Sequence, residues 1–167
     1  MPRLTIGCGV ASGHGHPGIT MDLNPAMNPT IVGSITDPAS PLLANALYRR
    51  YFHPIIFENI TGGVFATQKD CDTIVAHLSI VLAANGVVSI VTGRGSAGYL
   101  PKMRQSFRKF GFVILLERFD INGDEVTSTR LNELGVDLSA AQIDESPLML
   151  VVQRGAGTLN KSQESPI

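Results

Sequence analysis

The chain has 167 residues, 44% of them hydrophobic, which is enough to bury a substantial core. Thirteen basic and 14 acidic side chains give a net charge of −1, so no overall field attracts nucleic acid or anionic membranes. The apolar runs are far shorter than the roughly 20 residues that span a bilayer, and no secretory signal pattern precedes them. We expect one cytoplasmic domain over residues 1–154, with a disordered polar tail over 155–167. Export as an effector by a signal-less route would leave the same pattern.

Six short apolar runs, mostly β-branched or aromatic, predict β-strands. They are Leu4–Cys8, Ile19–Leu23, Ile55–Glu58, Val87–Thr92, Phe112–Phe119 and Leu148–Gln153. Because few polar residues interrupt these runs, we expect both faces of each strand to be buried. That pattern is typical of a parallel sheet packed between helices.

Segments with helical spacing of apolar residues lie between these strands. The clearest runs from Lys69 to Ala84, with Thr67 or Asp70 as its cap and Asn85-Gly86 as its stop. Others are expected over Leu100–Lys109 and Pro41–Tyr51. The alternation predicts an α/β fold, with a doubly wound, mostly parallel, Rossmann-like sheet and helices on both faces.

Beyond Phe119 the pattern changes to turn residues. Asn122-Gly123 is a strong hairpin signal, which predicts an antiparallel element near the C-terminus. A calcium loop over 120–131 is excluded, because Leu131 stands where an EF-hand needs its bidentate glutamate. A short helix is expected around Leu131–Leu134.

The first two strands end in residues that suit a nucleoside-containing cofactor. Gly7 and Gly9 allow close backbone approach, and the Asp22 carboxylate can accept hydrogen bonds from a ribose. The intervening residues 10–18 hold three glycines and a proline, so they lack the helix that pyrophosphate sites use. Asp22 also comes sooner than the roughly 20-residue spacing of a dinucleotide fingerprint. A cofactor without phosphates, such as S-adenosylmethionine, needs neither feature.

Further motifs follow in a characteristic order. Pro17–Pro25 and Asn28–Asp37 continue the opening Leu4–Gly9, and Phe57–Ile60 and Leu82–Ile90 come later. Together they resemble the class I S-adenosylmethionine-dependent methyltransferases that have an abbreviated first helix. The resemblance covers roughly the first two thirds of the chain. It implies methyl transfer by direct displacement to an acceptor, a small molecule or a protein, that the sequence does not identify.

The resemblance also implies roles for individual residues. By this resemblance, Asp22 would hold the ribose, and Ile35 and Thr36 would flank the adenine. Glu58 would orient or deprotonate the acceptor's nucleophile. Thr5 and Ser34 depart from the family, which usually has acids there. The full set implied for the cofactor is Gly7, Cys8, Gly9, Asp22, Leu23, Ile35, Thr36 and Asp37, with Glu58 and Asn59 on the substrate side.

Two groups of polar residues have competing interpretations. His14 and His16 resemble a metal pair but have no third ligand, so we expect no metal and assign their loop to the cofactor or substrate. Basic residues between Arg94 and Lys109 could bind a phosphate-bearing substrate, but a solvated helix face is the better reading. We find no aromatic-basic interleaving suited to single-stranded nucleic acid. His53 and His77 are interpreted as structural.

Two alternatives to an active methyltransferase remain open. The first is a non-catalytic methyltransferase-like module that uses the fold to bind protein, suggested by Thr5 and Ser34. The second is a nucleotide-dependent oxidoreductase, which the missing helix disfavours. The oligomeric state is not predicted.

Overall fold

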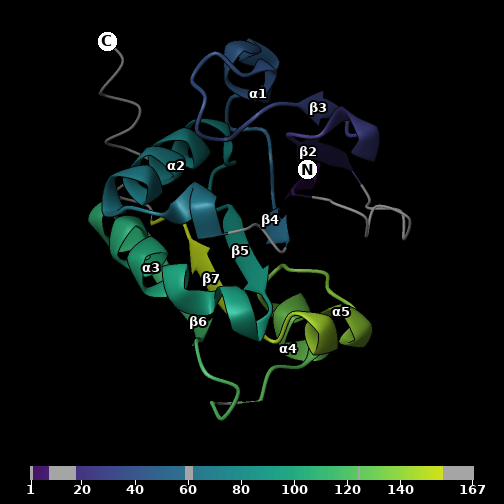
Figure 1. The fold of residues 1–167 in the computed structure, drawn as a ribbon, viewed down its shortest axis with the longest axis vertical. Coiled ribbons are helices and arrows are strands. Elements are labelled where there is room, and N and C mark those ends of the chain that lie inside the picture. Colours follow the sequence, from purple (N-terminus) through teal and green to yellow (C-terminus); the bar gives the residue numbers. More distant parts are fainter. Residues whose placement is uncertain (1, 8–17, 59–61, 124, 156–167) are drawn as a thin grey trace.

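The computed structural model describes residues 2–7, 18–58, 62–123 and 125–155 (Figure 1). A seven-stranded sheet runs through it in the order β3-β2-β1-β4-β5-β7-β6. The first five strands of this order are parallel, whereas β7 is antiparallel to both β5 and β6. The strands are β1 (Leu4–Ile6), β2 (Ile19–Asp22), β3 (Ile31–Val32), β4 (Ile55–Glu58), β5 (Val87–Thr92), β6 (Val113–Arg118) and β7 (Leu148–Gln153).

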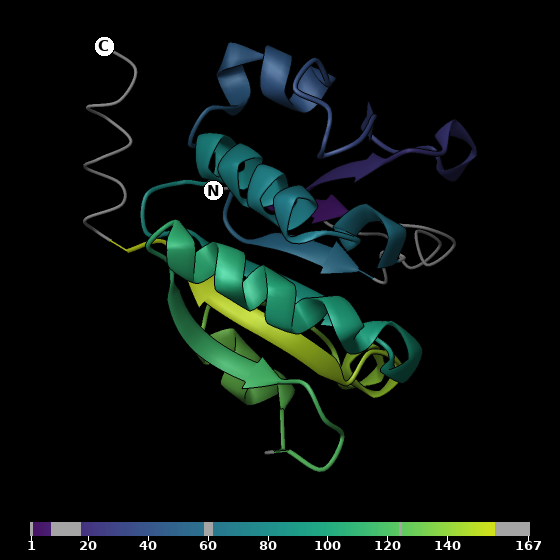
Figure 2. The same cartoon turned by 60° about the vertical axis from the view of Figure 1, so that its left-hand side comes forward.

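Helices cover both faces of this sheet. The α-helices are α1 (Pro41–Ala44), α2 (Gln68–Val81), α3 (Leu100–Lys109), α4 (Ser128–Glu133) and α5 (Ala140–Glu145). Short 3-10 helices are η2 (Pro25–Met27), η3 (Ala46–Tyr48), η4 (Gly62–Phe65) and η5 (Arg94–Tyr99). Figure 2 shows α2 and α3 side by side in front of the sheet, with α4 and α5 behind it. The doubly wound, mostly parallel fold expected from the sequence is therefore confirmed.

One apolar core lies on each face of the sheet, because successive side chains of a strand point to opposite faces. Val88 and Ile90 of β5 pack in one core with Leu42, Leu78 and Phe107 of the front helices. The opposite core joins Val87 and Val91 to α4 and α5. Within the part of the chain that is described, no helix is long and apolar enough to cross a membrane.

Most predicted elements form, and several have different ends. Strands β4, β5 and β7 and helix α3 have the predicted bounds, and β1, β2 and β6 are shorter. The two-residue β3 was not predicted as a strand. Helix α2 starts with a capping box in which Thr67 Oγ1 accepts from Asp70 N–H and Asp70 Oδ2 from Thr67 N–H, both at 3.1 Å. It ends at Val81, before the predicted Ala84.

The predicted helix Pro41–Tyr51 is wrong as one element. Asn45 ends α1 in an extended conformation, and its side chain accepts from Leu47 N–H at 3.0 Å to start η3. Asparagine competes in this way with the helical backbone, so the helix breaks after its first turn.

The antiparallel element predicted near the C-terminus is confirmed, but Asn122-Gly123 does not join its two strands as a hairpin. The turn itself forms, because Gly123 N–H donates to Asp120 O at 3.0 Å. The chain then enters α4 instead of returning, and β6 finds its antiparallel partner in β7. Helix α4 begins earlier than the helix expected around Leu131–Leu134, and α5 was not predicted.

Candidate functional site

The carboxyl ends of β1, β2 and β4 meet at one edge of the sheet, since these strands are parallel and adjacent. Ile6 pairs with both Met21 and Phe57, so Gly7, Asp22 and Glu58 end neighbouring strands at the same level. The arrowheads of β1 and β4 point to this edge, on the right of Figure 2. Open α/β sheets bind ligands at this edge, which makes it the candidate site.

Gly7 directly follows β1 in a left-handed conformation with φ of +76°, which favours glycine. Its N–H donates to Met21 O at 2.9 Å, so this donor completes the sheet. The other residues that the sequence assigned to neighbouring loops lie outside the described part of the chain: Cys8, Gly9, His14, His16 and Asn59.

Asp22 is half-buried at the end of β2. Its Oδ1 accepts from Asn24 N–H at 2.9 Å, and Asn24 Oδ1 accepts from Ala26 N–H at 3.0 Å, which starts η2. These turns hold the carboxylate at the sheet edge. Leu23 beside it is 62% exposed.

The segment after β3 uses most of its polar groups locally. Ile35 is buried in the core, and its carbonyl bonds to His77 Nδ1 of α2. The hydroxyls of Ser34 and Thr36 lie 2.7 Å apart, and Asp37 Oδ1 accepts from Ala39 N–H at 2.9 Å. Asp37 is exposed and Thr36 is half-buried, so both are more accessible to a ligand than the buried Ile35 side chain.

Glu58 ends β4 and is only 7% exposed. Gln142 Nε2 of α5 donates to Glu58 Oε1 at 3.1 Å, and an Arg3 guanidinium nitrogen lies 4.0 Å from the same oxygen. Arg3 also donates to Asp137 O at 3.0 Å and to Thr5 Oγ1 at 3.3 Å. Burial lowers the pKa of Arg3, and the charges of Glu58 and Asp137 oppose that shift. The carboxylate is thus held from the back of the sheet.

The capping box fixes the orientation of the Gln142 side-chain amide. Its Oε1 accepts from Ser139 N–H at 2.9 Å in a capping box, which leaves Nε2 to face Glu58. Sequence reasoning missed both Arg3 and Gln142. The Ser139-x-x-Gln142 spacing is a capping signal that could have revealed α5, but no local pattern indicates that α5 packs beside β4.

Aromatic rings close the sheet edge between β4 and β5 toward the front helices. Phe65 of η4 stacks on Tyr99 of η5 with centroids 4.3 Å apart, and it meets Phe57 edge-on at 5.9 Å. Burial raises the pKa of the Tyr99 hydroxyl, and Thr92 partly offsets that shift. Tyr99 is therefore a neutral phenol at pH 7, poorly suited to act as a base.

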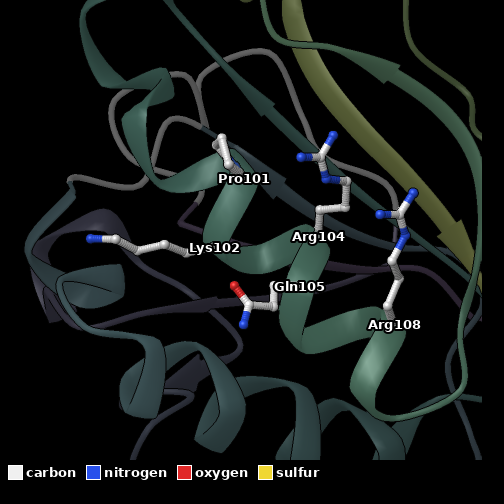
Figure 3. A pocket seen from close by; sticks show the side chains of 5 residues that line it. All are labelled: Pro101, Lys102, Arg104, Gln105 and Arg108. Carbon is white, nitrogen blue, oxygen red and sulfur yellow. The ribbon is translucent and has the colours of Figure 1, made fainter.

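A basic hollow on the outer side of α3 is a separate feature (Figure 3). Lys102 Nζ donates to Ala66 O at 2.8 Å, and Arg104 donates to both oxygens of Glu117 at 3.2 Å. Because every lining residue comes from this one helix, the hollow is a groove between solvated side chains. The lining residues are Pro101, Lys102, Arg104, Gln105 and Arg108.

Histidines of the described segments serve the fold. His53 Nδ1 accepts from Val87 N–H at 3.0 Å, and His77 bonds to Ile35 O. No group of three metal-ligating side chains occurs among the described residues.

Comparison with known proteins places this geometry in a fold family. No protein-family model and no curated protein sequence matches the chain. Solved methyltransferase structures do match: the CurJ carbon methyltransferase has a TM-score of 0.52 at 14% identity, covering 93% of this chain and 48% of that one. The chain has the fold of class I S-adenosylmethionine-dependent methyltransferases.

Two further methyltransferase structures extend the comparison. The antibiotic-resistance methyltransferase Kmr has a TM-score of 0.52 at 13% identity, covering 93% of this chain and 88% of that one. A putative methyltransferase in complex with the Haloferax volcanii Trm112 activator has a TM-score of 0.51 at 11% identity, covering 91% and 80%. The chain described here spans about half the length of the CurJ chain. At such identities the likeness concerns the fold alone.

Proposed function

We propose that the protein is an S-adenosylmethionine-dependent methyltransferase that binds its cofactor across the carboxyl edge of β1, β2 and β4. The observation that carries the proposal is Asp22, a carboxylate at the end of β2 beside the left-handed turn at Gly7. S-adenosylmethionine would supply an electrophilic sulfonium methyl group to an acceptor not yet identified. The sheet order with β7 reversed between β5 and β6 supports the same assignment.

The residues present suit the nucleoside end of this cofactor. Asp22 is held by its turn with Asn24, and a charged acceptor makes stronger hydrogen bonds to hydroxyls than a neutral one does. Thr36 and Asp37 offer polar groups on the neighbouring loop, suited to the adenine. No phosphate requires a helix N-terminus in this arrangement, which agrees with the glycine-rich sequence after β1.

Glu58 would act on the acceptor side as a fixed hydrogen-bond acceptor. Arg3 and Gln142 both engage its Oε1, so it is better placed to orient a nucleophile than to swing toward one. Alignment of the nucleophile supplies much of the rate of a direct displacement. Asn59 remains an assignment from sequence.

A second candidate is a non-catalytic module of the same fold that binds protein. Three local contacts favour it: Gly7 N–H completes the sheet, the Ser34 hydroxyl pairs with Thr36, and Thr5 is fully buried against Arg3. Thr5 and Ser34 stand where the resemblance leads one to expect acids. In this candidate the cofactor edge would bind no S-adenosylmethionine.

Isothermal titration with S-adenosylhomocysteine separates the two candidates. Asp22→Asn keeps an oxygen for the Asn24 N–H but removes the charge, so binding should weaken by roughly 10- to 100-fold, the effect of one or two charge-assisted hydrogen bonds. Asp120→Asn is the matched control, because Asp120 Oδ1 accepts from Asn122 N–H at 2.9 Å in a similar turn after β6, which is five strands away from β2 in the sheet. Unchanged affinity in Asp22→Asn would reject the ribose assignment. No binding by the parent protein would favour the non-catalytic module.

A further inference from the structure

A second surface lies at the amino end of β4, opposite the candidate cofactor edge. It comprises η3, the residues after it and the last turn of α2, and lies beside α1 in Figure 1. Arg50 N–H donates to Ile80 O and Tyr51 N–H to Val81 O, both at 2.9 Å, which fixes this segment to the helix. We call it the Tyr-Arg surface, and it consists of Leu47, Tyr48, Arg49, Arg50, Tyr51 and Ile80.

Three large hydrophobic residues of the Tyr-Arg surface are exposed. Leu47 is 78% exposed, Ile80 43% and Tyr51 41%. The Tyr51 and Tyr48 rings pack against the buried Phe52 ring at 5.1 Å and 5.3 Å. The tyrosines are therefore held in place while they face solvent, so little rotamer freedom would be lost on binding a partner.

Among the described residues, no acidic side chain forms an ion pair with the arginines of this surface. Arg49 and Arg50 are exposed, and neither has an ion pair within the described segments. The carbonyl end of α2, which would attract cations, is already occupied, since Arg154 donates to Ser79 O and to Leu82 O, the latter at 3.2 Å. Burial lowers the pKa of Arg154, and the nearby charge of Arg50 adds to that shift.

Arg50 also adopts a left-handed backbone conformation, with φ of +51°. For a residue with a Cβ this costs roughly 1–2 kcal/mol, a cost that glycine avoids. Strain of this kind concentrates at functional positions. The arginine side chain at this position therefore calls for an explanation beyond the fold.

We propose that the Tyr-Arg surface docks an acidic segment of an accessory protein, one that also carries apolar side chains. Tyrosine and arginine are enriched at the energetic centres of protein interfaces, and two exposed arginines without an ion pair in the described residues favour an acidic partner by charge complementarity. Two exposed arginines on a chain of net charge −1 are too few for the row of phosphate contacts that nucleic acid offers. Because the surface lies at the opposite edge from Asp22, docking leaves the candidate site open. The inference does not depend on the proposed activity.

Fluorescence anisotropy with a labelled 12-residue peptide of aspartate, glutamate, leucine and phenylalanine tests the proposal. We expect binding that weakens with salt, and a loss of roughly two- to fivefold for each of Arg49→Ala and Arg50→Gly. Arg50→Gly suits the left-handed backbone, so its fold should remain intact. Leu47→Ser should weaken binding without changing the salt dependence.

Arg108→Ala is the matched control, because it removes an exposed arginine of α3 outside this surface. It should leave peptide binding unchanged. Peptide affinity that is absent, or equal in Arg49→Ala, Arg50→Gly and the parent, would overturn the proposal. A labelled oligothymidine that binds more tightly than the peptide and loses affinity in the same variants would overturn it in favour of nucleic acid.

Discussion

Replacing Gln142 by glutamate tests how α5 is held against the end of β4. Glutamate keeps the capping box, since its carboxylate can still accept from Ser139 N–H. The atom that now donates to Glu58 Oε1 at 3.1 Å becomes an oxygen, so two carboxylates face each other beneath the candidate site.

The size of the effect follows from the burial of Glu58. Two unit charges about 4 Å apart interact with about 4 kcal/mol at an effective dielectric constant of about 20. Arg3 and small side-chain movements reduce the repulsion, so we predict a loss of about 2–4 kcal/mol in the free energy of unfolding at pH 7. Gln142→Ala should lose about 1–2 kcal/mol, for the cap and one hydrogen bond.

Urea unfolding of the three proteins at pH 7 and pH 4 distinguishes these effects. Protonation of either carboxylate removes the repulsion, so most of the Gln142→Glu deficit should disappear at pH 4. The Gln142→Ala deficit should stay nearly constant, because it involves no new charge. A Gln142→Glu variant as stable as the parent at pH 7, or equally impaired at both pH values, would refute the packing of α5 on Glu58.

Two further predictions concern the fold. Gly18→Ala should lower the free energy of unfolding by about 2–4 kcal/mol, since φ is +85° and an added Cβ would lie 2.4 Å from Arg3 O. Thermal unfolding measures the loss, and Gly98→Ala is the control, because a Cβ added there would meet no atom within 4 Å. Burial raises the pKa of the Cys71 thiol to about 11, so in a Cys8→Ser variant Ellman's reagent should modify no thiol of the native protein at pH 8 and one thiol after unfolding. Because the thiol ionises more easily in the unfolded chain, the free energy of unfolding should also fall as the pH rises from about 9 toward 11. Prompt labelling of the native protein would contradict the burial of Cys71.

Elements with strong, uninterrupted patterns were predictable from the sequence. The apolar runs of β4, β5 and β7 have the expected bounds, and Pro101 near the start of α3 with basic residues near its end marks that helix correctly. The order in which these strands pair cannot be seen in any local window.

The differences have physical causes in single residues. Only three residues separate Pro29 from Gly33, and so short a run shows no strand periodicity; β3 forms there because β2 pairs with it. Asn45 interrupts the predicted third helix. The Asn122-Gly123 turn formed, but local turn chemistry could not reveal that the returning strand lies some 25 residues further on.

Some residues of the candidate site could be predicted from the sequence, and others could not. Asp22 and Glu58 could be assigned to the sheet edge, because each ends a recognisable strand. The partners of Glu58 could not, since Arg3 and Gln142 are 55 and 84 positions away from it in the chain. Pairings of this kind arise only from the tertiary fold.

The most direct test of the proposed cofactor edge is an amide NMR titration of the 17.8 kDa protein with S-adenosylhomocysteine. We predict that the largest chemical-shift changes fall on Asp22, Leu23, Thr36 and Asp37, with the Tyr-Arg surface unaffected. Saturable changes confined to other parts of the molecule, or no changes at millimolar ligand, would contradict the assignment of this edge to S-adenosylmethionine.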